Sequence, residues 1–264
     1  MWFFTELKEF IRSILSWIIV LVGFSFFFFL FDFKEVFLFD KAYLLPLPST
    51  YDSFASQALL VIQEDLLPQG VELIVTNPLS AFLAQVIVSL LMAFIVTLPY
   101  FFYKMFGYLF PALFESERKA ILKVLLPSVF LFFAGCAFAY HILIPLIFKT
   151  LYPYTVIIGA VPFFSVQEFI SLVFGIMIAV GIMFLLPVFM SLLAFLGLIG
   201  PSFWKRNWRH ALLVFLIFSA IITPDGTGIS MMILSAPLAG LYFLGVVGTV
   251  TFSRSRDSNA NISP

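Results

Sequence analysis

The membrane character of this chain is clearest in residues 78–118, PLSAFLAQVIVSLLMAFIVTLPYFFYKMFGYLFPALFESER. No Asp, Glu, Lys or Arg occurs from residue 73 to residue 103. About 20 consecutive apolar residues, folded as a helix, cross the ~30 Å hydrocarbon core of a bilayer. We therefore interpret residues 82–104 as a membrane-spanning helix that is followed by a charged loop.

The composition extends this interpretation to the whole chain. Hydrophobic residues make up 62% of the 264 positions and charged residues 11%, whereas soluble domains carry about 25% charged residues. The mean hydropathy is +1.13. These values exclude a soluble globular domain. The formal net charge is zero, so nucleic acid is not expected as a partner.

Six charge-poor runs are candidates for membrane spans. Backbone polar groups must be paired internally in lipid, so each run is expected to be an α-helix. The last two helices are expected to be short, because residues 211–223 reach only about 20 Å and Pro237 interrupts the final run. The predicted fold is an all-α integral membrane protein with six transmembrane helices. Its spans are expected near 12–31, 82–104, 121–144, 168–193, 210–223 and 230–251.

The distribution of basic residues predicts the orientation. Eleven of the 14 Lys and Arg residues fall on the side that holds both termini, and the other three, Lys34, Lys41 and Lys149, fall on the opposite side. Basic residues favour the cytoplasmic side, so both termini are expected in the cytoplasm.

The loops complete the predicted domain organisation. Segment 32–81 is expected to be an external cap with a short amphipathic helix at 53–66. Residues 1–252 are then a single membrane domain, and residues 253–264 a polar cytoplasmic tail.

No feature of the sequence predicts catalysis. Ionisable side chains inside spans usually mark proton or ion paths, and the interiors of the six spans contain none. There is also no His/Asp/Glu cluster at metal-ligand spacing, no glycine-rich phosphate loop and no nucleophile elbow. We therefore expect no catalytic residue, no metal and no cofactor.

Four carboxylates stand at the expected cytoplasmic face, where basic residues are the norm. Glu6 and Glu9 precede the first span, and Glu115 and Glu117 lie between the second and third. One interpretation is helix capping or pairing with nearby Lys and Arg. The other is a docking surface for a basic peptide, because a carboxylate can accept two parallel hydrogen bonds from an Arg guanidinium.

The chain resembles the TatC family, the multispan receptor subunit of the twin-arginine protein translocase, from about residue 6 to about residue 250. The most specific match is 78–118, where a proline near the inner end of the second span is followed by a Tyr and by the pattern P-x-L-[YF]-x-x-E-[RK]. Further matches, in the family's order, are Gly135-x-x-Phe138-x-Tyr140, Pro145, Phe184-x-x-Pro187-Val188 and Thr223-Pro224-Asp225.

The resemblance implies a non-enzymatic subunit that binds twin-arginine signal peptides at its cytoplasmic face. With single-span partners of the TatA and TatB type it would export folded proteins, driven by the proton-motive force. It also implies the plasma membrane of a prokaryote and a homo-oligomer within a larger complex. Peptide binding is assigned to Glu6, Lys8, Tyr108, Glu115, Glu117 and Arg118. Structural or partner-contact roles are assigned to Pro99, Tyr140, Leu185, Pro187, Asp225 and Met231.

Two positions depart from the family pattern. The family often carries a glutamate in the fourth span where this chain has Leu185, and a Gln early in the sixth where it has Met231. Both family residues are associated with partner-helix contact. An alternative function, a secondary transporter or lipid flippase, would need a central polar cavity and broken helices at the midplane. An intramembrane enzyme would need a base or nucleophile within the spans.

Overall fold

The computed structural model describes residues 2–38, 41–49, 52–67, 71–109, 115–157, 159, 163–195, 197–223 and 228–260. Within them, five helical stretches are long and apolar enough to cross a membrane, and a sixth apolar helix is shorter. The predicted all-α membrane fold class is confirmed. The five long stretches are Lys8–Leu30, Pro78–Met105, Leu125–Tyr154, Val166–Phe195 and Ile229–Thr251, and the shorter one is Trp208–Ile222.

Contacts divide the chain into two compact units, each of which we describe by itself. The first unit holds α1 (Trp2–Leu30), β1 (Phe31–Leu38), β2 (Lys41–Pro48), α2 (Phe54–Leu66), β3 (Glu72–Ile74), α3 (Pro78–Leu109) and β4 (Phe163–Ser165). The second holds η2 (Ala139–Leu143), α5 (Ile144–Ile157), α7 (Leu186–Phe195), α8 (Pro201–Arg206), α9 (Trp208–Ile222) and α10 (Ile229–Ala260). Two helices, α4 (Glu115–Phe138) and α6 (Val166–Phe184), pass from one unit to the other.

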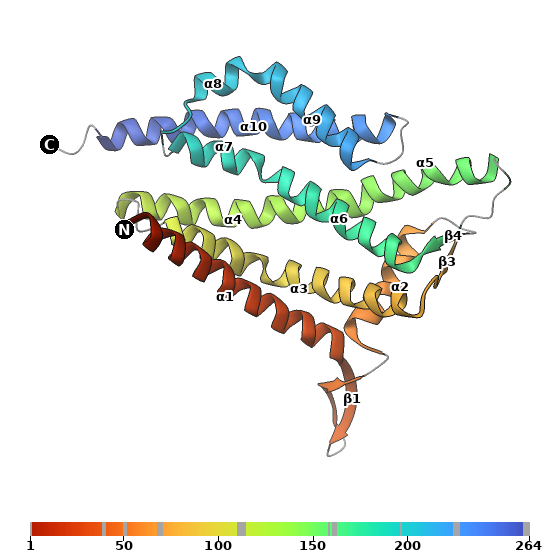
Figure 1. Cartoon of the computed structure of the whole chain (residues 1–264). Helices are drawn as coiled ribbons and strands as arrows, with labels where there is room; N and C mark the ends of the chain where they lie inside the picture. Colours follow the sequence, from red (N-terminus) through yellow and green to blue (C-terminus); the bar gives the residue numbers. More distant parts are fainter. Residues whose placement is uncertain are drawn as a thin grey trace. The chain divides into compact units, whose positions relative to one another are not determined.

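Helices α1 and α3 form an antiparallel pair in the first unit (Figure 1). The ring of Trp17 lies 5.9 Å from that of Phe94 and 4.8 Å from that of Phe101, measured between centroids. Further along α1, the Oγ atoms of Ser25 and Ser89 are 3.0 Å apart. A polar group in an apolar environment is costly without a partner, so this hydroxyl pair favours one register of the two helices.

Beyond α1 the chain folds into a cap that the sequence predicted only in part. The amphipathic helix expected at 53–66 is confirmed as α2, which begins after Ser53, whose side chain accepts a hydrogen bond from the Ser56 N–H over 3.3 Å. The antiparallel hairpin of β1 and β2 was not predicted. Gln57 of α2 donates a 2.9 Å hydrogen bond to the buried Asp32 carboxylate of β1. The hairpin is therefore attached to α2 by a partly buried hydrogen bond.

The first unit also contains a short parallel pair of strands. Strand β3 pairs with β4, which lies about ninety residues later in the chain and leads directly into α6. The hydroxyl oxygens of Thr76 and Ser165 lie 3.4 Å apart beside this pair. The start of α6 is thus attached to the segment that precedes α3.

The helix predicted to end near residue 144 continues through α5 and contains a π-helical turn. In η2 the Ile144 N–H donates to the carbonyl of Ala139, five residues earlier. Pro145 has no N–H for the carbonyl of His141, so the regular i to i−4 pattern cannot continue there. The widened turn places Tyr140, half-buried, beside His141, with ring centroids 5.0 Å apart.

The fourth predicted span, 168–193, consists of two helices rather than one. Helix α6 ends at Phe184 and α7 begins at Leu186, with Leu185 between them. Pro187 explains the interruption, since its ring has no N–H and clashes with the carbonyl four residues earlier. The Leu185 N–H donates a 3.1 Å hydrogen bond to the carbonyl of Ile182, three residues earlier.

Small residues allow close helix packing in the second unit. A Cβ placed on Gly245 of α10 would lie 2.7 Å from Met190 Sδ and 3.0 Å from the Cα of Pro187, both on α7. A Cβ on Gly248 would lie 2.6 Å from Ser191 Oγ. Close approach of backbones through small residues is the usual way in which membrane helices associate. Pro187, predicted as a structural or partner-contact residue, therefore packs within the chain.

A partly buried hydrogen bond joins helix α8 to α10. The Tyr242 hydroxyl donates to the Trp204 carbonyl over 2.6 Å, and only 2% of Tyr242 is exposed. Tyr242 also packs on Phe215 of α9, with ring centroids 5.9 Å apart. This residue therefore joins the three helices α8, α9 and α10.

Removing that hydroxyl tests the connection. Tyr242→Phe is expected to destabilise the protein by about 1 kcal/mol, because the Trp204 carbonyl loses this donor. The measurement is the midpoint of thermal unfolding in detergent. The exposed Tyr154 supplies a control, Tyr154→Phe. An unchanged midpoint in Tyr242→Phe would show that the hydrogen bond contributes nothing.

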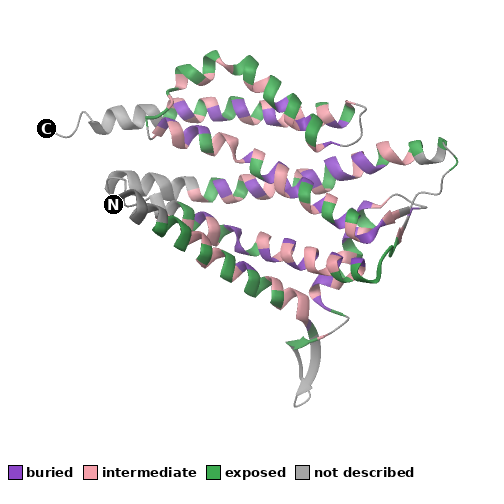
Figure 2. Cartoon of the chain, viewed as in Figure 1, coloured by how far each residue is buried: buried purple, intermediate pink, exposed green. Residues whose placement is uncertain are grey.

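Helix α1 exposes an apolar face along its length (Figure 2). Only 6% of its most apolar window is buried. The exposed side chains recur every three to four residues and therefore share one face of the helix. They are Ile11, Leu15, Ile18, Ile19, Val22 and Phe26. A face of this kind suits contact with lipid or with another apolar helix.

Candidate functional site

The predicted peptide-binding residues belong to three helix ends of the first unit. Lys8 is exposed near the start of α1. The side chains of the other five predicted residues lie outside the described part of the structure, although their backbones belong to helices. Glu6 is in the first turns of α1, Tyr108 in the last turn of α3, and Glu115, Glu117 and Arg118 in the first turn of α4.

These three helix ends lie at the same end of the first unit (Figure 1). The connection between α3 and α4 is residues 110–114, which can span at most about 20 Å when fully extended. The first turn of α4 must therefore start close to the end of α3. Contact between α1 and α3 along their length places the start of α1 beside the end of α3.

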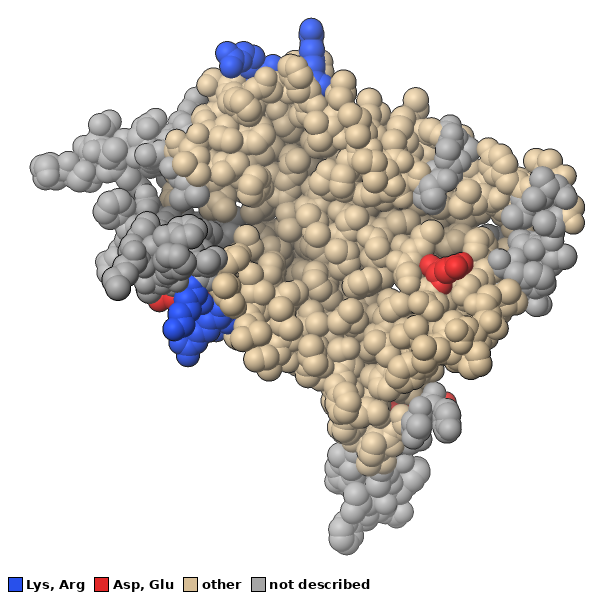
Figure 3. Space-filling view, in the orientation of Figure 1, with Lys and Arg blue, Asp and Glu red and all other residues tan. Residues whose placement is uncertain are grey.

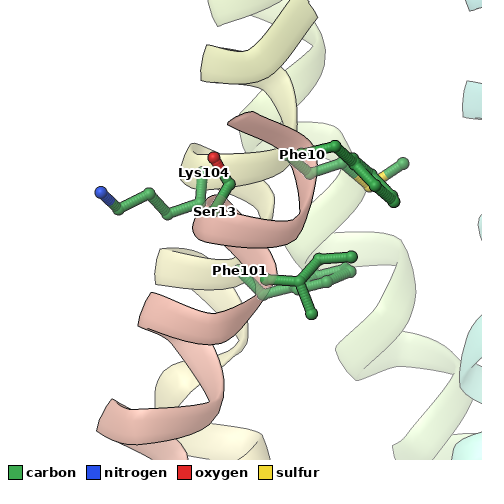
Figure 4. Close-up of a pocket in the computed structure, with 6 residues that line it drawn as sticks. Phe10, Ser13, Phe101 and Lys104 are labelled. Carbon is green, nitrogen blue, oxygen red and sulfur yellow. The ribbon is translucent and has the colours of Figure 1, made fainter. Parts of the chain in front are cut away.

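A small cavity lies between α1 and α3 near this end (Figure 4). Its volume is about 140 Å³. Phe10 and Ile14 of α1 and Phe101 and Met105 of α3 give it an apolar lining, which Ser13 and Lys104 complete. In Figure 4 the amine of Lys104 points away from the rings of Phe10 and Phe101. The cavity therefore offers apolar surface next to a charged rim.

Sequence reasoning did not identify this cavity. The available signal was the helical spacing of Phe10, Ser13, Ile14 and Trp17, which share the face of α1 that meets α3. That spacing alone predicts a buried face. Recognising a cavity required knowledge that Phe101 of α3 lies opposite, and helix pairing cannot be inferred from periodicity.

Charges are separated along the first unit (Figure 3). The basic residues Lys8, Arg12 and Lys104 lie toward the end where α1 begins, together with the exposed Glu9. Lys104 Nζ also lies 5.5 Å from the centroid of the Tyr100 ring, a cation–π contact. Beyond the other end of α1, the acidic residues whose side chains the structure describes are Asp32, Asp52, Glu64, Asp65 and Glu168. This pattern is typical of a helix pair with its basic end in the cytoplasm.

The remaining described positions belong to α3 and to the second unit. Pro99 is exposed within α3, and Met231 is half-buried in the first turn of α10. Tyr140 and Leu185 mark the π-helical turn and the break between α6 and α7. Asp225 lies outside the described residues. Over the described ranges, no group of three or more His, Cys, Asp or Glu side chains is placed to hold a metal ion.

Comparison with known proteins identifies the family. The family model for the Sec-independent protein translocase protein (TatC) matches residues 4–237. The TatC protein of Cenarchaeum symbiosum (strain A) is 40% identical over 201 residues, which cover 76% of each chain. That of Aquifex aeolicus (strain VF5) is 31% identical over 204 residues, covering 74% of this chain and 84% of the relative.

A solved structure agrees with this assignment over nearly the whole length. A crystal structure of the twin-arginine translocase receptor TatC superposes with a TM-score of 0.72 at 26% sequence identity. The match covers 94% of this chain and 99% of the other. Together with the apolar helices, these similarities show that the chain is a multi-pass membrane protein that belongs to the TatC family of Sec-independent protein translocase subunits.

Proposed function

We propose that this chain is the peptide-binding core subunit of a twin-arginine translocase in the plasma membrane of a prokaryote. The observation that carries the proposal is the convergence of three helix ends in the first unit. The start of α1, the end of α3 and the start of α4 bring the positions of Glu6, Tyr108 and Glu117 to one end of that unit. Membership of the TatC family supports the same assignment.

The orientation follows from the charges. The end with Lys8, Arg12 and Lys104 faces the cytoplasm, and the cap of β1, β2 and α2 faces outward. Helix α9 is the fifth of six spans, although its 15 residues reach only about 22 Å. Local thinning of the bilayer or burial against α10 would accommodate the difference. Both termini are then cytoplasmic.

The carboxylates supply the specificity for arginine. Glu6 and Glu117 each accept two parallel hydrogen bonds from a guanidinium, a geometry that Lys cannot reproduce. Glu115 and Glu117 stand in the first turn of α4, where the helix dipole stabilises a negative charge. Tyr108 offers a ring on which a guanidinium can stack. The resemblance to the family also assigns Lys8 and Arg118 to this site.

Transport requires partners. Single-span subunits of the TatA and TatB type join this chain, several copies of which form the core of a larger complex. The folded cargo crosses under the proton-motive force, and the chain itself catalyses no chemical reaction. A partner helix can pack on the exposed apolar face of α1, which consists of Ile11, Leu15, Ile18, Ile19, Val22 and Phe26. It can also pack near Leu185 or near Met231.

Peptide binding tests the proposal directly. The full chain in lipid nanodiscs is titrated with two fluorescent signal peptides that differ only in an Arg-Arg or a Lys-Lys pair. We expect the Arg-Arg peptide to bind at least about tenfold more tightly, because each lost bidentate contact costs roughly 1.5 kcal/mol or more. Equal affinities would overturn the assignment, since both peptides carry the same charge.

A further inference from the structure

Two cavities, both wide open at the surface, lie around helix α8 in the second unit. One, of about 400 Å³, extends along α9 to Val214. The other, of about 330 Å³, extends along α10 to Val246. Trp204 and Tyr242 line both. Their sizes fall within the range of small-molecule sites, roughly 300–1,000 Å³.

Trp204 and Tyr242, which separate the two cavities, contact each other. The Tyr242 hydroxyl donates to the Trp204 carbonyl, and the two rings lie 6.3 Å apart at an interplanar angle of 72°. The rest of the lining is largely apolar, with Phe203 on one side and Phe243 on the other. Each cavity can therefore take an apolar chain, and the pair can take two.

Basic residues occur on α8 and at the start of α9. Lys205 lines the second cavity, and Arg206 and Arg209 follow it in the sequence, all three exposed. Arg209 also lies 5.5 Å from the Trp208 ring, an arrangement common at membrane interfaces. No Asp or Glu occurs from residue 169 to residue 224. This positive group has no carboxylate within its own segment of the chain, which favours an external anion.

Basic residues beside apolar cavities are the features that a phospholipid requires of a binding site.

The length of α9 brings lipid headgroups within reach. Its 15 residues span about 22 Å, short of the ~30 Å hydrocarbon core. A bilayer that thins around a short helix places its phosphate groups deeper along that helix. The headgroup region would then lie level with Lys205, Arg206 and Arg209.

We propose that this part of the second unit binds an anionic phospholipid. Lys205, Arg206 and Arg209 hold its phosphate group, and its acyl chains lie in the two cavities on either side of Trp204 and Tyr242. The site is independent of peptide recognition, because it involves none of the residues assigned to the signal peptide. Its effect would be to fix the short α8–α9 segment against α10.

Lipid binding to the purified full chain tests this site. The protein in mild detergent is titrated with phosphatidylglycerol or with phosphatidylcholine, and bound lipid is counted by native mass spectrometry. We expect phosphatidylglycerol to bind at least about tenfold more tightly, since each basic residue near the headgroup contributes roughly fivefold. Equal binding of the two lipids would overturn the proposal.

Three variants distinguish the contribution of the basic residues to lipid binding from that of the cavity's shape. Lys205→Gln/Arg206→Gln is expected to weaken phosphatidylglycerol binding at least about tenfold, whereas the matched double variant Lys8→Gln/Arg12→Gln in the first unit is expected to leave it unchanged. Val214→Trp fills the first cavity and is expected to reduce lipid binding while all basic residues remain. Retention of the lipid preference in Lys205→Gln/Arg206→Gln would contradict the site.

Two further outcomes would also overturn it. Displacement of phosphatidylglycerol by an equal concentration of inorganic phosphate would show a simple anion site without an acyl component. A photocrosslinker placed at Val246 is expected to label lipid. If it labels a single-span partner subunit in native membranes instead, the second cavity belongs to a protein interface.

Discussion

Glu117→Gln is expected to lower the affinity for an Arg-Arg signal peptide by about tenfold to a hundredfold. The change keeps the size of the side chain but removes the charge and one of the two acceptor oxygens. Hydrogen bonds to charged groups are worth roughly 1.5–3 kcal/mol each, and about 1.4 kcal/mol corresponds to a factor of ten. The measurement is a peptide titration in nanodiscs, with folded protein confirmed by size-exclusion chromatography.

The control for this variant is an exposed carboxylate at the other end of the first unit. Glu64 of α2 is exposed, and Glu64→Gln is expected to bind the peptide as the parent does. Glu6→Gln should resemble Glu117→Gln, because each carboxylate is assigned to one guanidinium. Parent-like binding by both Glu6→Gln and Glu117→Gln would leave capping or local pairing as the role of these residues.

Gly135→Leu is expected to prevent normal packing of α4 against α6 and to remove most of the folded protein. A Cβ on Gly135 would lie 2.9 Å from the Cα of Gly181 and 2.9 Å from the Cβ of Phe184. The nearest atom at Gly181 belongs to the backbone, so a rotamer change cannot relieve the clash. Overpacking of this kind typically costs about 1–3 kcal/mol even for small insertions, and a full isobutyl group exceeds that.

Yield and thermal stability measure this effect. Gly175 lies on the same helix as Gly181, and a Cβ there meets nothing within 4 Å. Gly175→Leu is therefore the matched control and should retain the parent's elution profile and melting temperature. The milder Gly135→Ala should fold with a lowered melting temperature. A Gly135→Leu protein as stable as Gly175→Leu would show that the close approach is dispensable.

The membrane helices could be predicted from sequence because charged residues are excluded from the hydrocarbon core. The predicted span at 210–223 corresponds to α9, Trp208–Ile222, and the one at 230–251 begins within one residue of α10. Helix α10 then continues to Ala260, through most of the expected polar tail. A charge boundary marks where the membrane ends, and a helix can extend past it into water.

The interruptions within the helices were harder to predict. Pro145 and Pro187 were visible in the sequence, but proline in a membrane helix can be tolerated, or can give a kink, a π-helical turn or a break. Here Pro145 accompanies the turn η2, and Pro187 the break at Leu185. Which outcome occurs depends on the neighbouring helix, such as the contact of α7 with Gly245.

The hairpin in the cap was missed for a different reason. Residues 31–34 alternate Phe, Asp, Phe, Lys, which fits a strand. Strand β2 contains Pro46 and Pro48, and an isolated pair of strands tolerates proline because each strand has a free edge. Proline is therefore a weak argument against a two-stranded hairpin.

For the candidate site, sequence reasoning selected positions but not their surroundings. Glu6 and Glu117 could be chosen by resemblance to the family and because they carry negative charge at a face where basic residues are the norm. The apolar cavity at Phe10 and Phe101 could not, because it depends on how α1 pairs with α3. The structure adds that cavity as apolar surface available next to the carboxylate positions.

Export of a folded reporter protein tests the central claim most directly. Cells that lack their own TatC-type subunit receive this chain with its single-span partners, and a fluorescent reporter with an Arg-Arg signal peptide is followed across the plasma membrane. Folded reporter is predicted to accumulate outside only with the Arg-Arg signal and only while the proton-motive force is maintained. Equal export with a Lys-Lys signal, or no export although the chain is correctly inserted with its partners, would contradict the account.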